Sequence, residues 1–64
     1  AMAWYYGEIL REKRKEMNLT QQELSERTGL KRTYISRIEQ GETDMQLSSL
    51  IRISRALNLK FGLI

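Results

Sequence analysis

The stretch Leu19–Gly41, which reads LTQQELSERTGLKRTYISRIEQG, decides the fold. Within it, Thr20 can accept a hydrogen bond from a free backbone amide in the first turn of a following helix, and Glu23 completes a capping box. Gly29 comes next and suits the left-handed conformation in which many helices end, because a residue without a side chain adopts it without strain. The stretch therefore predicts a helix that begins just after Thr20 and stops at Gly29.

A second short helix is predicted from just after Leu30 to about Gln40, closed by Gly41. Ser25 is small at the point where the two helices must approach each other. Four apolar side chains are spaced to form the hydrophobic corner between them: Leu24, Leu30, Ile35 and Ile38. Two short helices joined by a tight turn that contains glycine form a helix-turn-helix, here over residues 20–41.

Two further helices flank this unit. The first is predicted over roughly Tyr5–Met17, where apolar side chains recur at spacings of three and four. The other is predicted from near Thr43–Asp44, both reasonable caps, to about Leu57. Its predicted inward stripe is Leu47, Leu50, Ile51, Ser54 and Leu57. The expected fold class is all-α, a compact four-helix unit, with residues 1–64 as one domain.

Composition excludes several classes of protein. The chain has 64 residues, 11 Lys and Arg, 8 Asp and Glu, a formal charge of +3, and no Cys, His or Pro. Without Cys or His it lacks a disulfide framework, an ordinary zinc site and the Ser-His and Cys-His nucleophile systems. We therefore expect no enzyme, no cofactor and no metal. No run is apolar enough to span a membrane and no signal peptide is evident, so a cytoplasmic protein is expected.

Basic charge is concentrated on the second helix of the helix-turn-helix. Residues 31–37 include Lys31, Arg32 and Arg37 and no acidic side chain, whereas the preceding helix sets Glu23 and Glu26 against Arg27. Charge placed in this way indicates a surface for nucleic acid, although the chain as a whole is only mildly basic. The plainer interpretation of a Lys-Arg pair on a short helix is a solvated face.

The segments L-T-Q-Q-E-L-S, T-G-L and Y-I-S-R-I-E-Q-G resemble the XRE, or lambda-repressor-like, helix-turn-helix family, and the resemblance extends over about Tyr5–Leu57. It implies that the helix at about 31–40 enters the major groove of double-stranded DNA. It also implies base contacts from the first half of that helix, with Arg32 and Arg37 as the main base readers. The implied base-contacting set is Lys31, Arg32, Thr33 and Arg37.

Phosphate contacts are implied at the start of the first helix of the motif, where Gln21 matches the family position. Three weaker candidates are Tyr34, Gln40 and Thr43. Two alternatives stay open: Tyr34 can simply pack within the domain, and Gln21 can be only a helix-start residue. Arg14 and Glu39 occupy positions where the family often has an ion pair that links the first helix to the end of the third, and we expect that pair to be structural.

The end of the chain departs from many members of the family, because it leaves no room for a fifth helix. It resembles the ending of HipB-type antitoxins, in which the fourth helix runs into a strand. Leu59, Phe61 and Leu63 alternate at period two, which predicts a strand over residues 59–64. A lone strand needs a partner, so it is predicted to pair with a second copy in a twofold homodimer. A frayed tail and a truncated fifth helix are the alternatives.

These observations predict a dimeric, sequence-specific transcriptional regulator, interpreted as a repressor, that reads a palindromic operator. One alternative is an antitoxin that binds both operator DNA and a toxin protein. The alternative from a different class is a protein-interaction module that uses the fold without binding DNA.

Overall fold

The computed structural model describes residues 2–59, with side chains from Tyr6 onward. These residues form four helices, α1 (Met2–Glu16), α2 (Gln21–Thr28), α3 (Arg32–Glu39) and α4 (Leu47–Ala56), and contain no strand. The predicted all-α, four-helix architecture is confirmed. Helix α1 begins three residues before the predicted Tyr5.

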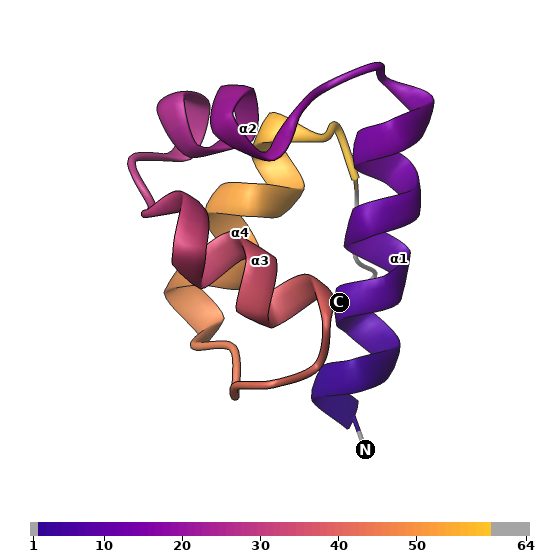
Figure 1. Cartoon of the computed structure of the whole chain (residues 1–64), viewed down its shortest axis with the longest axis vertical. Coiled ribbons are helices and arrows are strands. Elements are labelled where there is room, and N and C mark those ends of the chain that lie inside the picture. The colour runs from indigo at the N-terminus through magenta and orange to yellow at the C-terminus, as the bar shows by residue number, and fades with distance from the viewer. Residues whose placement is uncertain (1, 60–64) are drawn as a thin grey trace.

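Helices α2 and α3 join the other two helices into one unit, and α3 is the one that packs on α1. It contacts α1 and α2, and α2 in turn contacts α4. Figure 1 shows α1 along one side of the molecule, with the three shorter helices gathered beside it. The buried apolar side chains come from all four helices and their connections: Leu10, Leu19, Leu24, Ile35, Ile38, Ile53 and Leu57. This single core includes three of the four corner residues predicted from the sequence, and the fourth, Leu30, packs against it half-buried.

Helix α2 begins with the capping box that the sequence predicts. The backbone N–H of Glu23 donates to the Thr20 hydroxyl oxygen at 3.0 Å, and the backbone N–H of Thr20 donates to the Glu23 carboxylate at 2.9 Å. Two otherwise unpaired amides of the helix start are thereby satisfied. The box fixes the position at which α2 begins, and with it the place of Gln21.

Every described helix is followed by a residue with a positive φ. These residues are Asn18, Gly29, Gly41 and Asn58. After α4, the N–H of Leu59 donates to the carbonyl of Ser54 at 2.8 Å, and the N–H of Asn58 donates to that of Arg55 at 3.3 Å. This is the Schellman pattern, which satisfies carbonyl groups that the helix leaves free. The prediction that Gly29 ends α2 in the left-handed conformation is confirmed, with a φ of 76°.

Gly7 allows α1 and α3 to approach very closely. A Cβ atom added at Gly7 would lie 2.1 Å from the backbone oxygen of Ile38, far inside van der Waals contact. The obstacle is backbone, which cannot rotate away as a side chain could. Any side chain at position 7 would therefore push α3 away from α1, and α3 is the helix on which the predicted recognition surface lies.

The predicted start of the last helix is wrong. Helix α4 begins at Leu47 after an N-cap at Gln46, and not near Thr43–Asp44. The backbone N–H of Gln46 donates to the Tyr34 hydroxyl at 3.5 Å, and the half-buried Met45 packs against the core. The hydrogen bond at Gln46 and the packing of Met45 hold the connection outside the helix, which overrides the capping tendency of Thr43 and Asp44.

The predicted inward stripe of this helix is also partly wrong. Leu47 is 63% exposed and Ile51 is 40% exposed, whereas Ile53 and Ser49 are buried. Ser54 and Leu57 are buried as predicted, and Leu50 is half-buried. The helix is therefore rotated relative to the predicted stripe. The Tyr34 hydroxyl, which hydrogen-bonds the Ser49 hydroxyl at 3.2 Å, places the Ser49 side of α4 inward.

Of the predicted dimer strand, Phe61 and Leu63 lie outside the described residues. Leu59 is described, half-buried, and its N–H closes the end of α4. Leu59 is therefore part of the helix cap, and the remaining residues of the predicted strand, 60–64, lie outside the described residues.

Candidate nucleic-acid interface

Helix α3 has one buried side and one exposed side. Ile35, Ile38 and Glu39 are buried, while the side chains predicted to read bases are all exposed: Lys31, Arg32, Thr33 and Arg37. Lys31 is the N-cap residue and makes no side-chain capping bond, so its ammonium group is not used to start the helix. The structure thus brings the four predicted base-contacting residues to the exposed side of one short helix.

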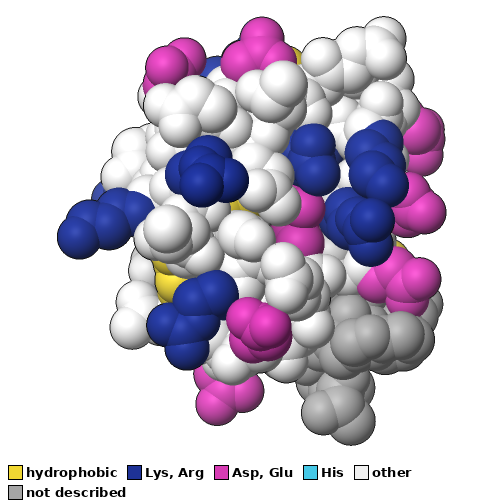
Figure 2. All heavy atoms as spheres, in the orientation of Figure 1, with side chains coloured by type: hydrophobic (Ala, Val, Ile, Leu, Met, Phe, Trp, Pro, Cys, Tyr) yellow, Lys and Arg dark blue, Asp and Glu magenta, His cyan; other side chains and the backbone are white. Residues whose placement is uncertain are grey.

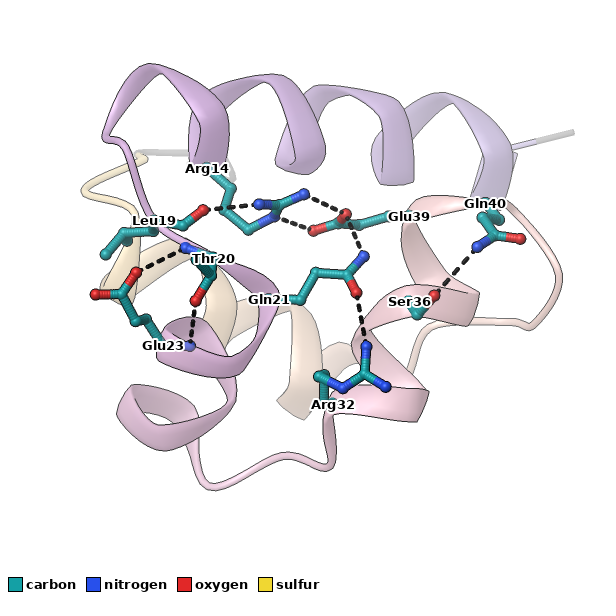
Figure 3. Close-up of polar contacts among 9 residues, drawn as sticks. All are labelled: Arg14, Leu19, Thr20, Gln21, Glu23, Arg32, Ser36, Glu39 and Gln40. Atoms are coloured by element: carbon teal, nitrogen blue, oxygen red, sulfur yellow. Dashed lines mark hydrogen bonds and ion pairs between the residues drawn. The ribbon is translucent and has the colours of Figure 1, made fainter.

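An arginine on α1 holds the other end of α3. Arg14 donates from Nε to Glu39 Oε2 at 2.8 Å and from Nη2 to Glu39 Oε1 at 3.0 Å, and its Nη1 donates to the Leu19 carbonyl at 2.7 Å (Figure 3). The two side chains are only 11% and 3% exposed. A bidentate guanidinium–carboxylate pair of this geometry fixes orientation as well as distance. Arg14 and Glu39, paired by the sequence resemblance, therefore lie together and tie α3 to α1.

Gln21 connects this ion pair to the exposed side of α3. Its Nε2 donates to Glu39 Oε1 at 3.1 Å, and its Oε1 accepts from Arg32 Nη1 at 3.5 Å. Figure 3 shows the resulting chain of contacts, which runs from Arg14 through Glu39 and Gln21 to Arg32. The amide orients the Arg32 guanidinium while leaving that side chain exposed.

Positive charge lies on the face over α3. Figure 2 shows Lys and Arg side chains on this face, where α3 runs, with a second group along α1 and with Asp and Glu side chains interspersed and at the edges. On α3 itself, the acidic residue is Glu39, which is 6% exposed and pairs with Arg14. Its charge is therefore neutralised inside the domain, and the exposed side of α3 is purely basic and polar.

The weaker phosphate candidates are placed less favourably. The Tyr34 hydroxyl points to α4, where it bonds Ser49 and Gln46, and the ring is half-buried. The Gln40 amide donates to the Ser36 hydroxyl at 3.1 Å but is exposed, and Thr43 is half-buried. Tyr34 has a clear structural task, which agrees with the alternative that it packs within the domain.

Two side-chain hydrogen bonds that position α3 were not predicted from the sequence. The Ser25 hydroxyl donates to the Leu30 carbonyl at 2.5 Å, and the Thr28 hydroxyl accepts from the Leu30 N–H at 3.2 Å. Both bonds close the turn between α2 and α3. The signal available in the sequence was the hydroxyl residues before the glycine, since such side chains often bond nearby backbone groups.

One titratable group in this region has a displaced pKa. The backbone N–H of Thr20, together with the Thr20 side chain, lowers the pKa of the Glu23 carboxyl, and the charge of Arg27 acts in the same direction. The carboxylate form is thus the one that the capping box holds. Among the described residues, no three His, Cys, Asp or Glu side chains lie close enough to hold a metal ion. No described helix is long and apolar enough to cross a membrane.

Comparison with known proteins places this geometry in a family. Residues 10–64 match the model of a helix-turn-helix family. The chain belongs to this XRE-type helix-turn-helix family. It is a family of DNA-binding transcription regulators and not of enzymes.

Two relatives and one solved structure illustrate the likeness. The control protein C.SmaI of Serratia marcescens is 45% identical over 52 residues, which cover 81% of this chain and 62% of that protein. The uncharacterized HTH-type transcriptional regulator y4dL of Sinorhizobium fredii is 43% identical over 54 residues, 84% of this chain but 28% of that protein. The crystal structure of the restriction-modification controller protein C.AhdI from Aeromonas hydrophila superposes with a TM-score of 0.86 and 29% identity, covering 91% of this chain and 88% of that one. The match thus covers less than two thirds of the length of either relative, and the solved structure supports the four-helix fold.

Proposed function

We propose that this helix-turn-helix domain binds double-stranded DNA sequence-specifically and regulates transcription, with α3 in the major groove. The observation that carries the proposal is the exposed basic side of α3, whose opposite side is fixed to α1 and α2. Arg32 and Arg37 are the proposed main base readers, because a guanidinium can donate two hydrogen bonds to guanine O6 and N7. Lys31 and Thr33 are proposed as secondary base contacts.

Gln21 is proposed to contact a phosphate at the start of α2, where free backbone N–H groups also favour an anion. Its amide already orients Arg32, so a phosphate contact there would bring backbone positioning and base reading to one point. Gln40 and Thr43 are proposed as weaker phosphate contacts. Tyr34 ranks below them, because its hydroxyl is hydrogen-bonded to α4.

The finer regulatory role is also a proposal. We propose that residues 1–64 act as one domain and pair in a twofold dimer through a strand within residues 60–64. The two α3 helices of such a dimer, about 34 Å apart along the duplex, would read the two halves of a palindrome. A repressor acting in the cytoplasm fits such a dimer. The names of the relatives, a control protein and a restriction-modification controller protein, support regulation. The HipB-like ending and a toxin partner stay predictions of the sequence.

Salt-dependent binding to duplex DNA tests the central proposal. A duplex selected from a random pool should bind the wild type with an affinity that falls steeply with salt, because phosphate contacts release counterions. The double variant Arg32→Ala/Arg37→Ala should bind that duplex at least about thirtyfold more weakly in fluorescence anisotropy, since each of the two bidentate base contacts is worth about 1–3 kcal/mol. The matched control, Arg11→Ala/Lys15→Ala, removes the same charge from exposed positions of α1 and should bind much more tightly than the α3 variant.

Two results would contradict the proposal. Equal losses in both double variants would show that only net charge matters. Absence of duplex binding by the full chain would favour the protein-interaction module instead. The dimer is tested separately by sedimentation of a chain that ends at Leu59, which keeps the α4 cap intact. That chain should be monomeric, and a dimer would exclude the strand.

A further inference from the structure

A cavity of about 580 Å³ opens where the C-terminal ends of α2 and α4 meet. Its lining residues are Arg27, Thr28, Arg52, Arg55, Ala56 and Asn58. None of these is among the residues proposed to contact DNA. The cavity therefore calls for an explanation separate from the exposed side of α3.

Three guanidinium groups gather at this cavity without a carboxylate among its lining residues. Within residues 6–59, no hydrogen bond or ion pair joins the side chains of Arg27, Arg52 or Arg55 to another group. The nearby carboxylate is Glu23, whose charge interacts with that of Arg27 but which accepts its hydrogen bond from the Thr20 N–H. The three arginines are exposed, so solvent screens their mutual repulsion, and an anion between them would reduce it further.

Compensation of the helix dipoles is the plainer explanation for arginines at two helix ends, and Arg27 and Arg55 do lie in the last turns of α2 and α4. In each of these turns at least one carbonyl already accepts a hydrogen bond from another group, and within the described residues no guanidinium donates to one. In α2, the Ser25 carbonyl accepts from the Gly29 N–H at 2.9 Å. In α4, the Ser54 carbonyl accepts from the Leu59 N–H. The guanidinium donors are therefore free for an external partner.

We propose that this cavity binds a small phosphate-bearing anion. The planar fork of arginine matches two oxygens of a phosphate, and three forks suit a group with more than one phosphate. The volume lies in the range of small-molecule sites, about 300–1,000 Å³. Asn58 adds an amide that can donate or accept. An apolar contact with a protein partner is disfavoured, because Ala56 supplies the apolar side chain of the lining and interface cores are apolar.

The cavity lies beside the turn that joins α2 to α3. A Cβ atom at Gly29 would be 3.9 Å from Arg52 Nη1, so the guanidinium of Arg52 lies next to this turn. An anion held by Arg27 on one side and by Arg52 and Arg55 on the other would link α2 to α4. Because it binds the folded chain and not the unfolded one, it would raise the midpoint of thermal unfolding.

Titration with inorganic pyrophosphate at constant ionic strength tests the proposal, by calorimetry and by thermal unfolding of the full chain. The wild type should show saturable binding and a rise in Tm. The variant Arg52→Gln/Arg55→Gln should bind at least tenfold more weakly, and Arg27→Gln should show a smaller loss. The matched control Arg11→Gln/Lys15→Gln removes the same charge from exposed positions of α1 and should bind like the wild type. Circular dichroism without ligand checks that each variant is folded.

Three outcomes would overturn the proposal. Equal weakening in the cavity variant and the α1 control would mean that pyrophosphate responds only to net charge. Loss of binding in Arg32→Gln/Arg37→Gln, with the cavity variant unaffected, would place the anion on the DNA-binding side. Tighter binding of a glutamate-rich peptide than of pyrophosphate would identify an acidic protein segment as the partner.

Discussion

The two sides of α3 have opposite relations to the rest of the domain. On the inner side, Ile38 lies against Gly7 of α1 through its backbone, and Glu39 is held by Arg14 in two hydrogen bonds. On the outer side, Arg32 and Arg37 are exposed, and Arg32 has one long contact with Gln21 at 3.5 Å. Folding therefore depends on the inner side and makes little use of the outer one.

This difference explains how so small a domain can present a rigid recognition surface. The exposed side chains are free for a ligand, while their backbone is fixed by contacts on the opposite side. Substitutions on the inner side should lower the free energy of unfolding, and substitutions on the outer side should lower DNA affinity alone. Single substitutions on each side of α3, measured for both stability and DNA affinity, test this difference directly.

The largest expected effect is on the inner side. Arg14→Ala leaves the Glu39 carboxylate buried without its guanidinium partner, which typically costs about 3–5 kcal/mol in free energy of unfolding. Urea denaturation followed by circular dichroism should show a strongly reduced midpoint, or a chain already unfolded in buffer. Arg11→Ala, an exposed arginine one turn earlier, is the control and should change stability by less than about 0.5 kcal/mol. Equal midpoints for both variants would show that the ion pair contributes nothing.

The next effect tests the backbone contact. Gly7→Ala should destabilise the domain by about 1–3 kcal/mol, the usual cost of forcing extra volume into a packed site. The sign is informative, because alanine in place of glycine inside a helix normally stabilises it by about 0.5–1 kcal/mol. A raised Tm in this variant would mean that α1 and α3 do not approach as closely as described.

Gly7 also shows the limit of what the sequence could predict. The helix-turn-helix can be predicted from short-range sequence patterns: the capping box at Thr20, the left-handed end at Gly29 and the apolar corner residues. Each of these patterns involves residues only a few positions apart in the chain. The approach of Gly7 to Ile38 depends on two segments far apart in the chain, and no spacing rule announces it. The start of α4 was wrong for the same reason, since Tyr34 and the core fix the residues before it.

The candidate site divides in the same way. Exposure of Lys31, Arg32, Thr33 and Arg37 followed from the helical period, because Ile35 and Ile38 had to face inward. The double contact of Gln21 could not be derived, since it joins α2 to both ends of α3 through side-chain rotamers. The same holds for the cavity between α2 and α4, where Arg27 meets arginines from a different helix.

Gln21 contacts both the buried Glu39 and the exposed Arg32 of α3. Its substitution is therefore expected to change stability and DNA affinity together, and this is the third prediction. Gln21→Ala removes a hydrogen bond to the Glu39 carboxylate and should cost about 1 kcal/mol of stability. It should also weaken DNA binding by releasing Arg32. A double-mutant cycle with Arg32→Ala, read out by DNA affinity, should give a coupling energy of at least about 0.5 kcal/mol. Additive losses would show that Gln21 acts independently of Arg32.

The smallest expected effect is on the capping box of Thr20 and Glu23, which fixes the start of α2 and so the position of Gln21. Because the pKa of Glu23 is lowered in the folded chain, its carboxylate contributes stability above its unfolded-state pKa, and this contribution is lost as the pH falls through the folded-state pKa. Wild type should therefore exceed Glu23→Gln in Tm at pH 7, and the difference should shrink as the pH falls below the unfolded-state pKa of the carboxyl and through its lower folded-state pKa. Glu26→Gln, exposed on the same helix, controls for the loss of one acidic charge. Its Tm difference from wild type should change less with pH, and an equal change would assign the effect to overall charge. The comparison shows whether the capping box that positions Gln21 depends on the ionised form of Glu23.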